Sequence, residues 1–224
     1  MNPLIASLEG KLIVSCQAYM GEPLRHPETM AQMARAAELG GAAAIRCQGL
    51  SDIAAIKGRV EIPVIGLWKE GHEGVYITPT LRHARACIAA GADVVAIDAT
   101  DRPRPDGRTF EETVDALRGE TLVMADCSCI DDVERALAAR VDIVSTTLAG
   151  YTDARPKTDG PDLEFLREAV AAAEPTGTPV FCEGRIHTLD DAKAAIEAGA
   201  FAIVVGTAIT HPTSITSWFA DAIA

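Results

Sequence analysis

The fold is decided by residues 94–126, which read VVAIDATDRPRPDGRTFEETVDALRGETLVMAD. Two short apolar runs in this stretch, 94–98 and 121–126, lack the strict alternation of a half-exposed strand and are typical of strands buried on both faces. Between them, residues 110–117 carry apolar side chains at helical spacing. Two strands of this kind with a helix between them indicate a parallel pair joined by a helical crossover.

The same unit recurs along the whole chain. Further strand-like apolar runs occupy residues 11–17, 42–47, 63–69, 143–147, 179–183 and 202–206. Segments with helical spacing occupy residues 28–39, 81–89, 131–139, 163–173, 190–198 and 214–223. An open doubly wound sheet needs polar edge strands, and none of these runs is polar, so eight units that close on themselves fit better. The sequence therefore predicts an α/β fold, a single (β/α)8 TIM barrel domain with a parallel eight-stranded core over residues 1–224.

Charge and composition narrow the classes of partner. The 224 residues include 20 Lys and Arg against 32 Asp and Glu, a formal net charge of −12. This balance disfavours nonspecific binding to nucleic acid or to an anionic membrane, because both are negatively charged. No apolar run reaches the roughly 18 residues of a membrane span, and no basic segment followed by an apolar run marks a secretory signal. We therefore expect a cytoplasmic protein whose partner is a small molecule.

The six cysteines favour a reduced protein without a metal site. Cys16, Cys47 and Cys182 fall inside strand-like apolar runs, where a buried thiol behaves as a small hydrophobic group. Cys127 and Cys129 form a Cys-x-Cys pair without a nearby His or further Cys, which is a weak metal signal. We expect neither a metal ion nor another cofactor.

Polar residues stand where the apolar runs end. In chain order they are Gln17, Arg46, Lys69, Asp98, Asp126, Thr147, Glu183 and Gly206 with Thr207. In a barrel these strand ends lie around one opening, or mouth, at the face that holds the active site in enzymes with this fold. One polar residue at a strand end carries little information, but six ionisable or amide side chains at six strand ends indicate a shared site.

The residue types at this mouth suit metal-independent proton transfer. Burial lowers the pKa of a lysine, so the neutral amine of Lys69 can serve as a base, with the carboxyl group of Glu183 as the complementary acid. The alternative is a simple ion pair between these two side chains.

The loops Glu183-Gly184-Arg185 and Gly206-Thr207 follow the last two strands, where barrels of this kind often bind phosphate. Alternatively, Gly206 only permits a tight turn.

Several motifs in register over nearly the whole chain carry a resemblance to a known family. They are SCQA (15–18), GLWK (66–69), DAT (98–100), RPDG (104–107), MAD (124–126), TTL (146–148), EGRI (183–186) and AIT (208–210). Each motif alone is weak, but the series is specific. It resembles the N-acetylmannosamine-6-phosphate 2-epimerase family of bacterial sialic acid catabolism.

The resemblance implies that the chain interconverts N-acetylmannosamine 6-phosphate and N-acetylglucosamine 6-phosphate without metal or nucleotide. It implies that Lys69 is the proton acceptor and Glu183 the proton donor. The candidates for binding the sugar are Gln17, Arg46, Asp126 and Thr147, and Asp126 either orients Lys69 or contacts a hydroxyl group. The candidates for binding phosphate are Gly184, Arg185, Gly206, Thr207 and His211. Two of these depart from the family pattern, because His211 stands where an arginine is usual and Thr207 where a second glycine is usual.

Two other functions stay open at this stage. The chain could be a catalytically silent phosphosugar-binding protein such as a sensor. It could also be another phosphate-binding barrel, although a ribulose-phosphate epimerase needs strand-end histidines and an indole-glycerol-phosphate synthase has a longer N-terminal extension.

The last predicted helix carries an apolar stripe of Ile215, Trp218, Phe219 and Ile223. We expect this stripe to pack on the barrel. The alternative is that it packs against another subunit in a homodimer.

Overall fold

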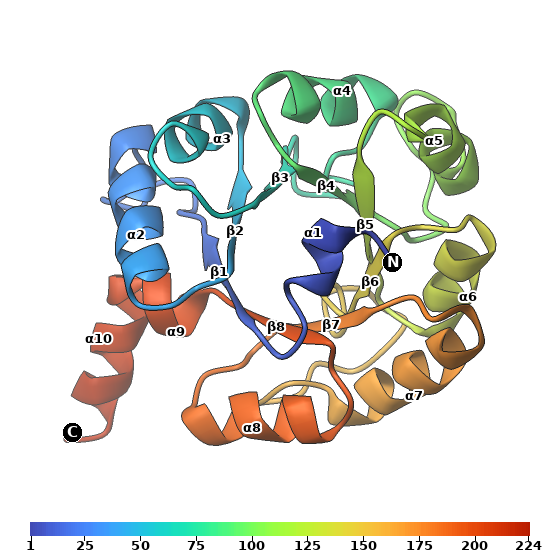
Figure 1. Ribbon diagram of the computed structural model, residues 1–224. Coiled ribbons are helices and arrows are strands. Elements are labelled where there is room, and N and C mark those ends of the chain that lie inside the picture. Colours follow the sequence, from blue (N-terminus) through green and yellow to red (C-terminus); the bar gives the residue numbers. More distant parts are fainter.

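Eight parallel strands close into a barrel in the computed structural model, which describes residues 1–224 (Figure 1). The strands are β1 (Leu12–Cys16), β2 (Ala44–Gln48), β3 (Val64–Leu67), β4 (Val94–Asp98), β5 (Leu122–Asp126), β6 (Ile143–Ser145), β7 (Val180–Glu183) and β8 (Ala202–Val205). Each strand pairs with the next in chain order, and β8 pairs with β1, so the sheet has no edge. The predicted eight-stranded TIM barrel is confirmed.

The helices are α1 (Pro3–Ala6), α2 (Pro27–Leu39), α3 (Leu50–Lys57), α4 (Leu81–Ala89), α5 (Phe110–Leu117), α6 (Ile130–Ala138), α7 (Leu163–Ala173), α8 (Leu189–Glu197), α9 (Thr207–Thr210) and α10 (Pro212–Asp221), with a 3-10 turn at Glu174–Thr176. All of them except α1 lie outside the ring of strands (Figure 1). The sequence predicted all of these except α1, α3 and α9, with bounds that agree within two residues. None of the helices has both the length and the apolar character that crossing a membrane requires.

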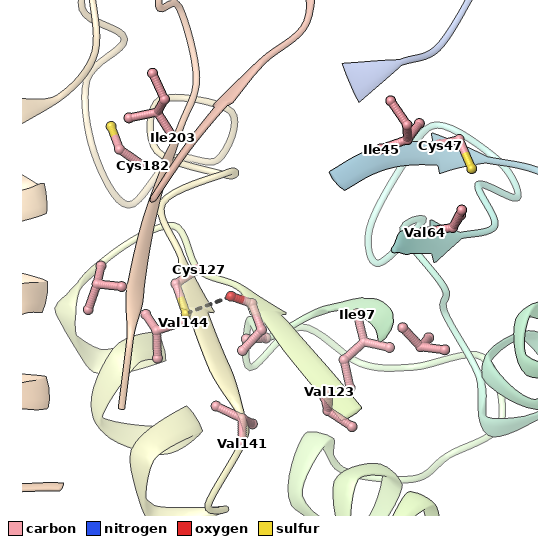
Figure 2. Packing of buried hydrophobic residues seen from close by; sticks show 14 of the residues in the cluster. Ile45, Cys47, Val64, Ile97, Val123, Cys127, Val141, Val144, Cys182 and Ile203 are labelled. Carbon is pink, nitrogen blue, oxygen red and sulfur yellow. Dashed lines mark hydrogen bonds between the residues drawn. The ribbon is translucent and has the colours of Figure 1, made fainter. Parts of the chain in front are cut away.

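Side chains of the strands alternate between the barrel interior and the layer beneath the helices. On β5, Met124 lies in the inner apolar cluster, whereas Val123 and Ala125 lie in the outer one. Figure 2 shows part of the outer layer, including Val123 and Val144 on neighbouring strands. Cys182 packs in the same layer, and burial raises the pKa of its thiol to about 12. This alternation decides which polar side chains at the strand ends face the interior.

Helix α1 closes the amino-terminal end of the barrel. It lies in the middle of the ring of strands (Figure 1). Ile5 on α1 and Leu8 just after it are 2% and 0% exposed and belong to the same inner cluster as Phe181 on β7. Apolar packing therefore fills this end of the interior and leaves the carboxyl end of the barrel for a polar site.

The C-terminal helix α10 points away from the barrel (Figure 1). It has no buried residue, and Phe219 is 74% exposed. The ring centroid of Trp218 lies 4.8 Å from that of His187, which follows β7. The prediction that this apolar stripe packs on the barrel is therefore wrong. Helical spacing shows that a face is apolar but not which surface covers it, and packing against another subunit stays a prediction.

Candidate active site

A cavity of about 210 Å³ opens at the carboxyl end of the barrel. Nearly all of the predicted site residues line it, namely Gln17, Arg46, Lys69, Thr147, Glu183, Gly184, Arg185, Gly206, Thr207 and His211. The exception is Asp126, which is fully buried at the end of β5. The structure therefore brings together in one place most of the side chains that the ends of the apolar runs indicated, but the prediction that Asp98 joins them is wrong.

The inward phase of each strand explains why these side chains reach the cavity. Glu183 and Asp126 are the last residues of β7 and β5, at inward positions. Lys69 follows β3 by two residues and keeps the inward phase of Leu67. Arg46 differs from the prediction, because it lies in the middle of β2 rather than at its end, with 1% of its surface exposed. Its charge therefore lies deeper in the barrel than a strand-end position would place it.

Arg46 binds two carboxylates at the floor of the cavity. Its Nη1 and Nη2 donate to Oδ1 and Oδ2 of Asp126 at 2.9 and 2.6 Å. Nη1 also lies 3.1 Å from Oε2 of Glu183, whose side chain is 15% exposed. Such a bidentate pair holds a planar guanidinium in a fixed orientation. One buried cation thus contacts two carboxyl groups at the floor of the cavity.

Burial raises the pKa of the Glu183 carboxyl above its ordinary value. The positive charge of Arg46 opposes this effect, and the nearby charge of Asp126 adds to it. A carboxyl group with a raised pKa keeps its proton at a higher pH and can donate it to a substrate. Glu183 therefore has the properties of a general acid.

Burial also lowers the pKa of the Lys69 ammonium group, to about 8. The positive charge of Arg46 contributes in the same direction, whereas Glu183 and Asp126 oppose it. Nζ makes no hydrogen bond or ion pair within the protein and lies 6.0 Å from the ring centroid of Tyr19. The alternative of an ion pair between Lys69 and Glu183 is therefore wrong, because the ion-pair partner of Glu183 is Arg46. Lys69 is an amine that can lose its proton near neutral pH.

The loops after β7 and β8 present free backbone N–H groups at the cavity. The amides of Gly184, Arg185 and Gly206 donate to no acceptor of the protein. Gly184 has a φ of 117°, a conformation that side chains rarely adopt. Backbone amides that have no partner in the protein can bind oxyanions such as phosphate.

The guanidinium group of Arg185 is largely engaged with the loop between β6 and α7. It donates to the carbonyl oxygens of Gly160 and Ala149 at 3.1 and 2.8 Å and to Oγ1 of Thr158 at 2.9 Å. These bonds use three of its five N–H groups. Arg185 therefore holds this loop beside the cavity and has only part of its side chain left for a ligand.

His211 is the N-cap residue of α10 and lines the cavity. Its Nδ1 accepts from the amide of Ser214 at 3.3 Å and lies 2.7 Å from Oγ of Ser214. An accepting Nδ1 places the proton of the neutral ring on Nε2. Nε2 is buried and lies 3.3 Å from Oε1 of Glu22 without hydrogen-bond geometry. The ring therefore has one donor that no acceptor of the protein satisfies.

Sequence reasoning missed the aromatic part of the site. All three tyrosines of the chain, Tyr19, Tyr76 and Tyr151, line the cavity. They lie in loops, where no apolar run leads up to them. The one signal for them in the sequence was the rarity of aromatic residues, which make up only 4% of the chain.

Asp98 at the end of β4 does not line the cavity. Its Oδ1 accepts from the amide and hydroxyl of Thr100 at 2.9 and 2.6 Å, and its Oδ2 accepts from Arg102 at 2.7 Å. These contacts use the carboxylate to organise the loop after β4.

Comparison with known proteins identifies the family. The family model described as "Putative N-acetylmannosamine-6-phosphate epimerase" matches residues 30–224. The "Putative N-acetylmannosamine-6-phosphate 2-epimerase" of Cutibacterium acnes is 62% identical over 98% of this chain and 96% of that protein. The chain belongs to the N-acetylmannosamine-6-phosphate 2-epimerase family. It is therefore an isomerase, and the resemblance carried by the sequence motifs is confirmed.

Other relatives of this epimerase family agree. The protein of the same name from Caldanaerobacter subterraneus subsp. tengcongensis is 49% identical over 96% of this chain and 92% of that protein. The solved structure of the N-acetylmannosamine-6-phosphate 2-epimerase from Clostridium perfringens matches with a TM-score of 0.93 at 41% identity, covering 98% of this chain and 96% of that one. A thiamine phosphate pyrophosphorylase from Pyrococcus furiosus, with a TM-score of 0.62 at 18% identity, shares the fold alone.

Proposed function

We propose that this chain interconverts N-acetylmannosamine 6-phosphate and N-acetylglucosamine 6-phosphate by moving a proton off and onto C2, without a metal ion. The observation that carries the proposal is the placement of Lys69 and Glu183 on one cavity. Lys69 follows β3 and Glu183 is the last residue of β7, and these two strands stand opposite each other in a ring of eight strands. A base on one wall and an acid on the other are what inversion of a carbon centre requires.

The reaction begins on the open-chain sugar, whose C2–H bond lies beside the C1 aldehyde. The neutral amine of Lys69 takes the C2 proton, and the electron pair of that bond forms the C1–C2 double bond of an enolate. Glu183 then donates its proton to the other face of C2, and the aldehyde is restored. Lys69 is left as an ammonium group and Glu183 as a carboxylate. The reverse reaction starts from these forms, so the enzyme needs one proton on this pair in either direction.

The other side chains support binding and positioning. Gln17 has a side-chain oxygen without a partner, which supports a contact between its amide and the sugar. Asp126 is fully buried and its oxygens accept from Arg46, which supports a role in orienting Arg46 rather than contact with a sugar hydroxyl. Arg46 would in turn hold the carboxyl group of Glu183 in place.

The phosphate group would lie on the loops after β7 and β8. The free amides of Gly184, Arg185 and Gly206 support this placement, and Thr207 and His211 line the same cavity. A neutral imidazole donor binds a phosphate dianion less strongly than a guanidinium group does. The backbone amides would therefore supply most of the binding.

Incubation of the protein with N-acetylmannosamine 6-phosphate is expected to produce N-acetylglucosamine 6-phosphate, followed by the anomeric proton signals in NMR spectra. Dialysis against a chelator should leave the rate unchanged, because the proposed base and acid are both side chains and no three His, Cys, Asp or Glu side chains gather where they could hold a metal ion. A rate that the chelator abolishes and that zinc or manganese restores would contradict the metal-free mechanism. Absence of the epimerised product would contradict the proposed function itself.

The pH profile of kcat/KM is expected to fall on the alkaline side with a midpoint near pH 8. Above that pH Lys69 loses its proton, and the pair of Lys69 and Glu183 then has none left to give. Because both directions need a singly protonated pair, this limb should be the same for either sugar phosphate. The measurement is initial rates from pH 6.5 to 10.5 in both directions. An alkaline midpoint near the ordinary lysine pKa of about 10.4 would show that the cavity does not perturb the pKa of Lys69.

A further inference from the structure

The hydroxyl group of Thr147 lies within hydrogen-bond distance of three other oxygens. Oγ1 is 2.7 Å from Oδ1 of Asp126, 3.0 Å from Oε2 of Glu183 and 2.8 Å from Oγ of Ser145. Thr147 follows β6 by two residues and keeps the inward phase of Ser145, so its side chain reaches the floor of the cavity. Two of its three neighbours are carboxyl groups, which accept hydrogen bonds when ionised.

Counting protons shows that these contacts cannot all be the same kind of bond. A hydroxyl group carries one proton and can accept at two lone pairs. Thr147 can therefore donate to Asp126 or to Glu183, but not to both at once. When it donates to Asp126, the contact with Glu183 is satisfied only if Glu183 is protonated and donates to Oγ1. When it donates to Glu183, that group can be an ionised carboxylate, and Asp126 keeps its two bonds from Arg46.

We propose that Thr147 is a positioning residue that stabilises both protonation states of Glu183 by turning its single O–H between Asp126 and Glu183. This inference rests on the proposed function and assigns Thr147 a role through Glu183 instead of contact with the sugar. No proton crosses Thr147, and no bond to hydrogen breaks there. Rotation about the C–O bond moves the single donated bond from Asp126 to Glu183, and Asp126 keeps its two bonds from Arg46, so each carboxyl group has a hydrogen-bond partner before and after Glu183 gives up its proton.

The other groups around Glu183 cannot reverse a hydrogen bond to it in this way. Arg46 on β2 is locked on Asp126 by two bonds, and both keep their places in either state. Lys69 after β3 and Tyr19 after β1 interact with Glu183 through space and make no hydrogen bond to it. Thr147 is thus the one neutral neighbour of Glu183 that can reverse its hydrogen bond. Loss of the hydroxyl removes a hydrogen bond from both forms of Glu183, but a bond to the charged carboxylate is stronger than one from the neutral acid, so the pKa of Glu183 should rise.

The test compares Thr147→Val, which removes the hydroxyl at nearly constant shape, with Thr147→Ser, which keeps it. The first readout is the pKa of Glu183, from 13C NMR titration of protein labelled at the glutamate carboxyl carbons, with the signal assigned by its absence in Glu183→Gln. We expect Thr147→Val to raise this pKa by about one unit and Thr147→Ser to leave it within a few tenths of a unit of wild type. Thr147→Ala serves as a second hydroxyl-free variant that cannot clash with its neighbours.

The second readout is the kinetics of epimerisation. We expect Thr147→Val to lower kcat by roughly 10- to 100-fold with a KM within threefold of wild type, and Thr147→Ser to restore most of the rate. An unchanged Glu183 pKa in both hydroxyl-free variants would overturn the inference, and a raised KM with unchanged kcat would return Thr147 to sugar binding. If the wild-type protein shows no epimerase activity, the proposed function fails, whereas the titration still decides the role of Thr147.

Discussion

Lys69→Met is expected to lower kcat/KM by roughly a thousandfold or more, since a general base commonly contributes 10²- to 10⁴-fold and no other amine lines the cavity. Methionine has a similar length but cannot take a proton. The measurement is the initial rate of epimerisation in both directions. The rates of both directions should fall together, because Lys69 accepts a proton from C2 in one direction and donates a proton to C2 in the other.

The folded state should tolerate this substitution. The ammonium group of Lys69 has no hydrogen-bond partner and is repelled by Arg46, so its removal should leave the Tm unchanged or raise it slightly. A matched control is Lys193→Met on the exposed face of α8. This lysine pairs with Asp190 and does not line the cavity. This control should keep normal turnover. Turnover of Lys69→Met within tenfold of wild type would remove the lysine from the mechanism.

Arg46→Met is expected to cause the largest loss of stability among the site variants. It leaves the carboxyl groups of Asp126 and Glu183, which are 0% and 15% exposed, without the cation between them. Breaking a buried charge pair from one side costs about 3–5 kcal/mol of unfolding free energy. At about 2–4 °C per kcal/mol for a chain of this size, the Tm should fall by roughly 6–20 °C. Thermal unfolding followed by circular dichroism measures this.

The stability lost in Arg46→Met should depend on pH in a defined direction. Without the guanidinium, the pKa of Glu183 in the folded state rises further above its unfolded value. A carboxyl group whose pKa is higher in the folded than in the unfolded state destabilises the fold when it is ionised. The loss of unfolding free energy is therefore largest at high pH, and it becomes smaller as the pH falls toward about 4.3, the pKa of glutamate in the unfolded chain. A deficit that widens in acid would contradict the assignment of the loss to unpaired carboxylates.

Two further variants separate charge from packing at Arg46. Arg46→Met combined with Asp126→Asn should recover part of the lost stability, because only one buried carboxyl group then remains and it can keep its proton. Arg59→Met removes a cation from an exposed pair with Glu28 and should change the Tm little. If the double variant is as unstable as the sum of the single variants, the pair is not coupled in the way the distances indicate.

The barrel could be predicted from the sequence because its strands are buried on both faces. Runs such as 94–98 are continuously apolar for that reason, and the glycines and polar residues that follow them mark the strand ends. The positions of Lys69, Asp126 and Glu183 followed from the same pattern. Closure of the sheet then brought residues that are more than 100 positions apart in the chain to one cavity.

The remaining features depend on three-dimensional contacts that no local pattern contains. Arg46 ended an apolar run in the sequence, but pairing with β3 continues the strand to Gln48. The three oxygens around Thr147 come from the ends of three strands, β5, β6 and β7, so their meeting could not be predicted from the spacing of residues in the sequence. The apolar stripe of α10 predicted its helical structure but not its exposure, because none of its residues is buried.

The central claim is that Lys69 and Glu183 act on opposite faces of C2, and deuterium exchange in heavy water tests it most directly. The measurement is the C2–H signal of N-acetylmannosamine 6-phosphate incubated with Glu183→Gln and, in parallel, with Lys69→Met. The account predicts that Glu183→Gln replaces C2 hydrogen by deuterium without forming N-acetylglucosamine 6-phosphate, because Lys69 can remove and return a proton on its own face only. It predicts no exchange with Lys69→Met. Exchange at equal rates in both variants, or a wild-type product without deuterium at C2, would contradict the account.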